Sequence, residues 1–223
     1  MCARYVLEAS EKEIEQAYAA KMQEEYVRNW NIAPTNKACV ITADHPDIIQ
    51  QYHFGLVPHW AKDKKVGYSL LNARSESALE KPSFKPLIEK NKRCLVLVNS
   101  FYEWETVGKE KLPYRFFLPE RPTFSFAGLY SWWKDPASQE WYKSFTIMTT
   151  APNGTVGQFH DRMPVILSKE EESIWLKGGV PISDIMSLCD PFPEVEMDLH
   201  RVSKDVNNVR NNNSDLILPE NSN

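Results

Sequence analysis

Residues 94–98 read Cys94-Leu95-Val96-Leu97-Val98, the longest strongly apolar stretch in this chain of 223 residues. A run this short cannot cross a bilayer, and without polar alternation it is typical of a strand buried on both faces. Further segments around it are rich in aromatic and β-branched residues, which favour strands. These segments are 38–42, 48–54, 114–118, 123–129, 144–150 and 163–167. The sequence therefore predicts a strand-rich core.

Two capping-box patterns predict helices beside this core. Ser10-x-x-Glu13 precedes apolar residues at helical spacing, which predicts an amphipathic helix over residues 11–28. Ser168-x-x-Glu171 repeats the pattern and predicts a second, shorter helix. Both patterns lie outside the strand-like segments, so we expect these helices at the periphery.

The remaining stretches indicate how the chain is organised. Residues 58–67 are basic and punctuated, which predicts a loop, and residues 182–188 predict a further helix. From about residue 207 the chain is polar and rich in Asn, which predicts an irregular tail. No internal repeat and no linker rich in Pro or Ser divides the sequence. We therefore expect an α+β fold in a single domain over residues 1–223, with a β-rich, barrel-like or strongly bent sheet as core and peripheral helices.

Charge is unevenly distributed along the chain. The net charge is −4, which argues against a protein that coats nucleic acid without specificity. Residues 53–93 nevertheless carry nine Lys or Arg against four Asp or Glu, whereas residues 168–198 carry two against eight. Such asymmetry permits a basic face on an acidic protein, although a charge run is most often only a solvated surface.

The cysteines give no sign of a metal site or a disulfide framework. No two of them form a C-x-x-C pair, and the sequence has neither a metal-ligand cluster nor a glycine-rich phosphate loop. We therefore expect no metal and no cofactor. The N-terminus lacks the apolar core of a signal peptide, and no stretch predicts a membrane helix, so we expect a cytoplasmic protein.

Position 2 of the chain is a cysteine. Removal of Met1 ahead of this small residue would leave Cys2 with a free α-amine and a thiol on adjacent carbons. The amine titrates near about pH 8 and the thiol near about 8.5, so both are partly nucleophilic at neutral pH. Such a 1,2-aminothiol condenses with an aldehyde to an imine, and the sulfur then closes a five-membered ring. By position alone, a cysteine here is more often incidental.

Short motifs that span nearly the whole chain change this interpretation. They are 1–5 (MCARY), 31–35 (NIAPT), 55–60 (GLVPHW), 72–76 (NARSE), 93–95 (RCL), 101–104 (FYEW), 126–130 (FAGLY), 160–164 (HDRMP) and 202–206 (VSKDV). Each motif alone is weak, but the ordered series resembles the SOS-response-associated peptidase (SRAP) family, the abasic-site-crosslinking proteins. Ala3 and Ser100 depart from the family pattern, which usually has Gly at both positions. Neither change removes a reactive group, but both could alter how the N-terminus is held.

The resemblance implies a β-rich α/β domain with a positively charged cleft. It implies that the N-terminal cysteine reacts with the ring-opened aldehyde of an abasic site in single-stranded DNA and forms a thiazolidine crosslink. Members of the family were also proposed to be thiol autopeptidases that remove their own initiator Met. The expected partner is single-stranded DNA with abasic sites, met at the nucleoid, and no obligatory protein partner is evident.

The resemblance assigns catalytic roles to Cys2, Asn72, Glu103 and His160. Cys2 is the nucleophile. Glu103 lies between two aromatic residues that are expected to raise its pKa by desolvation, although a single Glu on a strand more often faces solvent. His160 is assigned proton transfer at the opened sugar oxygen, although a lone His is more often structural. Asn72 offers amide hydrogen bonds to the α-amine or the substrate, or it simply forms a turn.

Contacts to DNA are expected from Arg4, Arg74, Trp60 and Arg162. By strand alternation Arg4 shares a face with the cysteine and Arg74 shares one with the asparagine, so both could hold phosphates. Trp60 precedes a group of lysines, which suits stacking on an unpaired base, although a core position is nearly as good an interpretation. Arg162 is equally a phosphate ligand or the partner of a buried acid.

Two alternatives to covalent capture remain open at this point. One is an N-terminal cysteine hydrolase that cleaves Met1 or a small amide, with the amine as base to its own thiol. The other is a non-covalent single-strand binding module, for which the charge and aromatic residues of region 53–93 would suffice.

Overall fold

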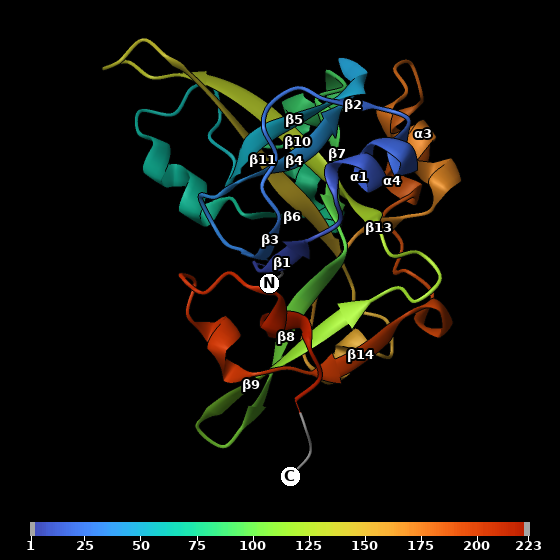
Figure 1. Cartoon of the computed structure of the whole chain (residues 1–223). Coiled ribbons are helices and arrows are strands. Elements are labelled where there is room, and N and C mark those ends of the chain that lie inside the picture. The colour runs from blue at the N-terminus through green and yellow to red at the C-terminus, as the bar shows by residue number, and fades with distance from the viewer. Residues whose placement is uncertain (1–2, 221–223) are drawn as a thin grey trace.

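Five strands close into a barrel in the upper part of the molecule (Figure 1). The structure, a computed structural model, describes residues 3–220. Parallel pairing of Phe145 with Phe54 joins the two ends of an otherwise antiparallel run of strands. Around the barrel the strands are β5 (His45–Phe54), β4 (Lys37–Thr42), β7 (Arg93–Val98), β10 (Phe124–Lys134) and β11 (Trp141–Thr150). The prediction of a β-rich, barrel-like core is confirmed.

The central strand β7 explains why residues 94–98 lack polar alternation. Every residue of β7 is buried, and the strand has hydrogen-bonded neighbours on both edges. Aromatic rings fill the adjoining core: Phe54 stacks on Phe145 with centroids 5.4 Å apart, and Tyr5 meets Phe54 edge-on at 5.7 Å. Tyr5 belongs to the N-terminal strand, so the start of the described chain packs into the barrel core.

A second, antiparallel sheet lies below the barrel in Figure 1. The chain crosses from the barrel into this sheet at Asn99. The Asn99 side chain fixes the crossing, because Oδ1 accepts hydrogen bonds from the backbone N–H groups of Glu8 (2.8 Å) and Ala9 (3.0 Å). The sheet order is β14 (Asp198–Arg201), β9 (Glu110–Phe117), β8 (Ser100–Val107), β1 (Tyr5–Leu7) and β3 (Asn29–Ile32).

The first helix is shorter than its pattern predicts. α1 (Glu11–Tyr18) begins with the predicted capping box at Ser10. The predicted extension to residue 28 is wrong, because Ala19 enters the left-handed region (φ 49°) and the chain continues as β2 (Lys21–Met22), parallel to β5. The Glu15 carboxylate fixes this exit by accepting a hydrogen bond from a backbone N–H of β2 at 2.9 Å. Apolar residues in a strand and a loop had therefore mimicked helical spacing.

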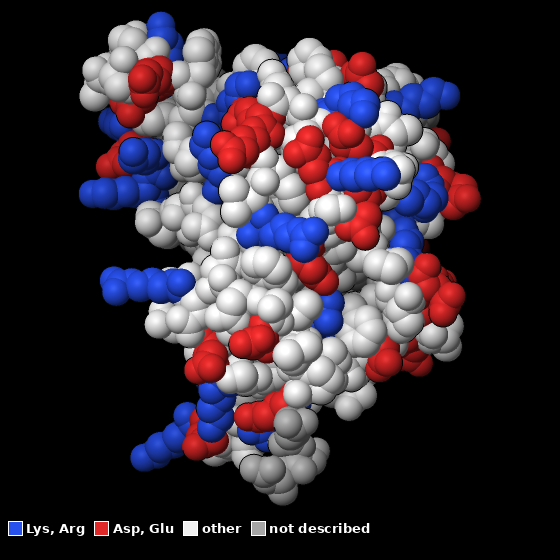
Figure 2. Space-filling model, in the orientation of Figure 1, with Lys and Arg blue, Asp and Glu red and all other residues white. Residues whose placement is uncertain are grey.

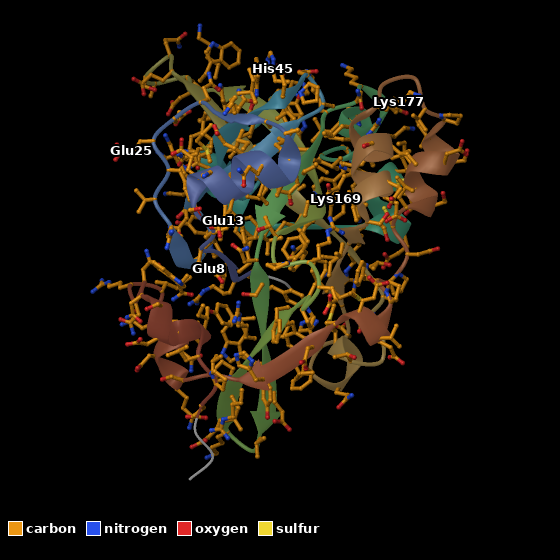
Figure 3. All side chains as sticks on the ribbon, turned by 45° about the vertical axis from the view of Figure 1, so that its right-hand side comes forward. Glu8, Glu13, Glu25, His45, Lys169 and Lys177 are labelled. Carbon is orange, nitrogen blue, oxygen red and sulfur yellow. The ribbon has the colours of Figure 1, made fainter. Side chains whose placement is uncertain are left out.

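The second capping-box helix, α3 (Lys169–Leu176), covers the barrel wall beside α1. Figure 3 shows Lys169 between the two helices, and its Nζ donates a hydrogen bond to the carbonyl of Ala17 at 3.1 Å. Trp175 is fully buried, and its Nε1 donates to the carbonyl of Cys94 at 3.1 Å. This helix was predicted from its capping box and is confirmed.

Shorter elements complete the described chain. They are α2 (Lys85–Glu89), α4 (Ile182–Ser187), β6 (Asn72–Arg74), β12 (Met163–Pro164), β13 (Ile166–Leu167) and the 3-10 helices η1 (Lys64–Ser69), η2 (Ser75–Glu80), η3 (Val156–Gln158), η4 (Glu194–Glu196), η5 (Lys204–Asn207) and η6 (Ser214–Ile217). The polar tail is irregular apart from these turns, yet Leu216 is buried in a small apolar cluster with Tyr102. Within residues 3–220, no helix is both long and apolar enough to cross a membrane.

Gly128 lies where the barrel wall leaves no room for a side chain. A Cβ at this position would lie 2.9 Å from Cys94 Sγ and 2.9 Å from Val96 Cγ2. We expect Gly128→Ala to lower the free energy of unfolding by about 1–3 kcal/mol, because overpacking displaces the neighbouring strands. Denaturant unfolding measures this loss. Gly157→Ala is the matched control, since its nearest neighbouring atom is 3.6 Å away, and equal losses in both variants would contradict the expectation.

Candidate active site

A cleft of about 570 Å³ opens between the β8–β9 hairpin and the segment that follows β11. It brings together two predicted catalytic residues that are far apart in the sequence, Glu103 on β8 and His160 after η3. In Figure 1 the β8–β9 hairpin extends from the lower sheet, away from the barrel. The described lining residues are Glu103, Trp104, Thr106, Lys111, Phe159, His160 and Asn207.

Glu103 is a buried carboxylic acid at this cleft. It is 3% exposed, and its Oε1 atom has no hydrogen-bond partner among the described residues. Burial raises the pKa of Glu103 to about 7, and the nearby Asp161 carboxylate adds to the rise. At neutral pH the group therefore divides between its acid and carboxylate forms, which suits both donation and acceptance of a proton.

Strand pairing holds Glu103 beside the start of the described chain. Tyr5 of β1 lies opposite Phe101 of β8, and the Tyr102 N–H donates to the carbonyl of Arg4 at 3.0 Å. The described chain begins one residue before this contact, at Ala3, and Glu103 follows Tyr102 directly on β8. Cys2 lies outside the described residues.

His160 favours the neutral imidazole. Burial lowers its pKa below the ordinary value. The backbone N–H of Arg162 donates to His160 Nδ1 at 3.0 Å, which needs a lone pair on Nδ1 and leaves the proton on Nε2. Asp161 Oδ1 also lies 3.0 Å from Nδ1 and would favour a proton on that nitrogen. The Asp161 side chain is 79% exposed, however, and can turn into water. We therefore assign the neutral form with the proton on Nε2.

The cleft walls contain residues that the sequence did not single out. Trp104 Nε1 donates to Asn207 Oδ1 at 2.6 Å, which joins β8 to the C-terminal segment across the cleft. Lys111 Nζ donates to Thr106 Oγ1 at 2.7 Å from the facing strand β9. Trp104 stands in the FYEW motif, so it could have been found from that signal. Lys111 reaches the cleft through the register of β9 on β8, and Asn207 reaches it because the C-terminal segment folds back beside β8. No local sequence pattern indicates either arrangement.

Arg4 lies largely inside the protein. It is 8% exposed, and its guanidinium donates to Asn31 Oδ1 and to the carbonyl of Val206. The guanidinium also lies 5.9 Å from the centroid of the Trp104 ring. Its observed contacts therefore support the cleft wall from behind, and a phosphate contact by Arg4 stays a prediction.

Asn72 and Arg74 lie on the barrel edge. In β6 they pair with Ile147 and Thr149 of β11, so both side chains share one side of an extended stretch as alternation predicts. Asn72 is half-buried and Arg74 is exposed. Neither is among the described lining residues of the cleft. Their catalytic and phosphate-binding roles stay predictions.

Arg162 and Trp60 also lie apart from the described cleft lining. The Arg162 guanidinium binds both carboxylate oxygens of Glu76 at 2.7 Å and the carbonyl of Thr149 at 2.8 Å, so it is the partner of an acid in this structure. Trp60 is 54% exposed, which excludes a core position. Its loop is attached to the barrel by Trp133, whose Nε1 donates to the carbonyl of Ala61 at 2.7 Å.

The three cysteines that the structure describes are unsuited to nucleophilic chemistry. Cys39, Cys94 and Cys189 are buried and free. Burial raises the pKa of Cys39 and of Cys189 to about 12 and raises that of Cys94 further still. All three are therefore protonated thiols at neutral pH and react slowly.

The charge on the molecular surface is mixed. Figure 2 shows Lys and Arg interspersed with Asp and Glu over the face in view, with basic side chains gathered at the left edge over the segment that contains η1 and η2. This gathering agrees with the excess of Lys and Arg in residues 53–93. Across residues 3–220, no group of three or more His, Cys, Asp or Glu is placed to hold a metal ion.

Comparison with known proteins finds similarity along nearly the whole chain. The sequence model described as SOS response associated peptidase (SRAP) matches residues 1–209. Abasic site processing protein YoqW of Bacillus subtilis (strain 168) is 39% identical over 97% of this chain and 99% of its own length. Abasic site processing protein HMCES of Xenopus tropicalis is 33% identical over 74% of this chain and 55% of its own length. The crystal structure of a protein from Bacteroides thetaiotaomicron superposes with a TM-score of 0.86 at 29% identity, covering 92% of this chain and 93% of that one.

Proposed function

This chain belongs to the SOS response associated peptidase family, and we propose that it captures abasic sites in single-stranded DNA through a covalent bond to Cys2. The relatives with 39% and 33% identity are named abasic site processing proteins, which supports abasic DNA as the substrate. We place this reaction in the cytoplasm at the nucleoid. We further propose that residues 1–223 act as one domain.

The observation that carries the proposal is the buried acid of the cleft. Glu103 has a pKa raised to about 7 by burial, and it shares the cleft with the neutral imidazole of His160. The described chain begins at Ala3, two residues before β1, the strand that pairs with the strand of Glu103. Loss of Met1 would therefore bring a terminal amine and thiol within a short reach of two groups that can transfer protons.

The proposed reaction conserves atoms and charge at each step. The Cys2 amine adds to the C1′ aldehyde of the opened sugar and gives a carbinolamine. Glu103 donates a proton to the carbinolamine oxygen, which leaves as water, and the resulting Glu103 carboxylate takes the proton from the nitrogen, so that the C=N bond of a neutral imine forms. The Cys2 sulfur then adds to the imine carbon, its proton passes to the nitrogen, and the thiazolidine ring closes. The net change is the loss of one water.

We assign the remaining groups of the site to binding the DNA and not to making or breaking bonds. The His160 Nε2–H can donate to the opened sugar oxygen. Lys111 is the one Lys or Arg among the described lining residues, and we assign it a phosphate next to the lesion. Arg74 is exposed at the barrel edge and offers a second cation to the strand. Trp104 presents an aromatic surface to the base next to the abasic site.

Intact mass spectrometry with an abasic oligonucleotide tests the proposal. The protein, prepared with its own N-terminus, is expected to lose Met1 and to gain the mass of the abasic single strand minus one water. The adduct should survive denaturation, and an otherwise identical strand without the lesion should give none. Absence of an adduct, or equal yields with both strands, would refute covalent capture.

The same samples also test the peptidase alternative that the family's description raises. An N-terminal cysteine hydrolase would turn over an amide substrate whether or not DNA is present, and it would form no lasting adduct. Covalent capture predicts the reverse: a single turnover on abasic DNA. Retention of Met1 when methionine aminopeptidase is absent would count against removal of that residue by the protein itself.

A further inference from the structure

A second small pocket, of about 200 Å³, lies at the end of the barrel away from the β8–β9 hairpin. It is formed by the end of β10 together with α2 and the turn that leads into β7. Its lining includes His59, Leu87, Lys90, Lys92, Tyr130 and Trp132. The pocket therefore combines an aromatic surface with several cations, and the proposed reaction uses none of these residues.

Trp132 presents a fixed and accessible ring in this pocket. The residue is 39% exposed. Its Nε1 donates a hydrogen bond at 3.0 Å to the hydroxyl of Tyr52, a residue that is itself fully buried. An indole held in this way loses little conformational entropy when a planar ring stacks against it. Exposed aromatic residues without such an anchor lack this preorganisation.

Two ammonium groups flank the indole of Trp132. Lys92 Nζ lies 5.8 Å from its ring centroid, and Lys143 Nζ lies 5.4 Å from it. Lys90 and Lys92 belong to the pocket lining, whereas Lys143 contacts the indole without being among the lining residues. The acid that faces this group is Asp44, which binds Lys92 Nζ at 2.6 Å and accepts a hydrogen bond from the Tyr130 hydroxyl. Lys92 is thus paired with an acid, whereas Lys90 and Lys143 form no ion pair within residues 3–220 and leave positive charge around the aromatic surface.

This combination matches one nucleotide of an unpaired strand. A nucleobase stacks on an aromatic ring whatever its identity, and the phosphates on either side seek cations. An acidic peptide without rings would contact the lysines but would leave the indole unused. We propose that the pocket binds a nucleotide of the captured single strand, with its base against Trp132 and its phosphates against Lys90 and Lys143. The identity of the strand rests on the proposed function.

The location of the pocket sets the length of DNA that can reach it. Figure 3 labels His45, the neighbour of Asp44, at the top of the molecule, whereas Figure 1 shows the β8–β9 hairpin at the bottom. Lys92 and Glu103 are joined by β7 and the first part of β8, so the straight distance between them is at most about 40 Å of extended chain. At about 3.4 Å per stacked nucleotide, a strand on a straight path needs up to roughly twelve nucleotides beyond the lesion to fill both sites.

Fluorescence anisotropy with strands of increasing length tests the inference. The probe is a labelled single strand without a lesion, so binding is measured apart from capture. For strands long enough to reach both sites, we expect Trp132→Ala to weaken affinity by about tenfold. For strands that cover only the cleft, we expect no change. Trp141→Ala is the matched control, because Trp141 is 62% exposed on the same hairpin but does not line the pocket.

A double variant tests the inference if Trp132→Ala does not fold. Lys90→Gln with Lys143→Gln removes one exposed and one half-buried cation, and it should lower the slope of log affinity against log salt by about 1.4 for long strands only. Equal affinity and equal salt dependence of the variants and the parent at every strand length would overturn the inference.

Failure of this inference can be told apart from failure of the proposed function. Adduct formation on short abasic strands should be unchanged in all the pocket variants, because they leave the cleft intact. If the parent protein forms no adduct, covalent capture fails, yet the dependence of affinity on length still reports whether the pocket binds DNA.

Discussion

Cys2→Ala is expected to abolish the denaturation-resistant adduct with abasic single-stranded DNA. The substitution keeps the terminal amine but removes the sulfur, so an imine can form but no ring can close. The three cysteines that the structure describes cannot replace the missing thiol, because they are buried and their pKa values are raised by burial. A denaturing gel measures the loss, and borohydride should rescue a crosslink by reducing the imine.

The matched control is Cys39→Ala, which removes a buried thiol far from the proposed chemistry. We expect this variant to form the adduct at the rate of the parent protein. A second variant with one residue inserted ahead of Cys2 should also fail, because the sulfur and the amine would then sit on different residues. A full yield of adduct from Cys2→Ala without reduction would exclude the thiazolidine.

Glu103→Gln is expected to slow adduct formation by about 10²–10⁴-fold, the range typical of losing a positioned general acid. The amide has the shape of the carboxylic acid but cannot give up a proton to the departing oxygen. Single-turnover rates at saturating DNA measure the effect. Glu105→Gln is the matched control on the same strand, since the Glu105 carboxylate accepts a hydrogen bond from the Tyr114 hydroxyl at 3.1 Å and does not line the cleft.

The pH profile separates a catalytic Glu103 from a structural one. Its pKa is raised to about 7 by burial, so the acid form is lost as pH rises through that value and the rate should fall. The terminal amine gains reactivity toward about pH 8, which gives the parent a bell-shaped profile. Glu103→Gln should lose the falling limb. A variant that is slower at every pH by the same factor would contradict the assignment.

The raised pKa of Glu103 also makes the free energy of unfolding depend on pH. A carboxyl whose pKa is raised in the folded state stabilises the fold in its protonated form, and this contribution is lost progressively as pH rises from the ordinary value of 4.5 to about 7. Glu103→Gln should therefore flatten the dependence of unfolding free energy on pH across that range. This measurement needs no DNA.

Local sequence predicted the five barrel strands but not β3 or β14, and several predicted boundaries differ from those of the structure. Residues 94–98 form a buried strand because an apolar run with no alternation fits a position between two neighbours. Helix 11–28 failed beyond Tyr18 because the left-handed turn at Ala19 and the bond from Glu15 to β2 depend on packing against β5. A periodic pattern does not record where such contacts interrupt it.

Site chemistry was visible in the sequence only where a motif carried it. Glu103 and His160 were expected together, and the structure places both at one cleft. Lys111 was not expected, because it reaches the cleft through the register of β9 on β8. Arg4 was expected at a phosphate, but its neighbours Asn31 and Val206, which come from distant segments, surround its guanidinium.

The sequence by itself determined the strand-rich character of the chain, its capped helices and a cysteine at position 2, because side-chain periodicity, capping and residue identity are local properties. Only the tertiary structure decided that β5 meets β11 to close the barrel and that Glu103 is buried at the cleft that His160 also lines. The physical reason is that strand pairing, and the burial that raises a pKa, depend on segments that are distant in the sequence. These segments come together only when the chain folds.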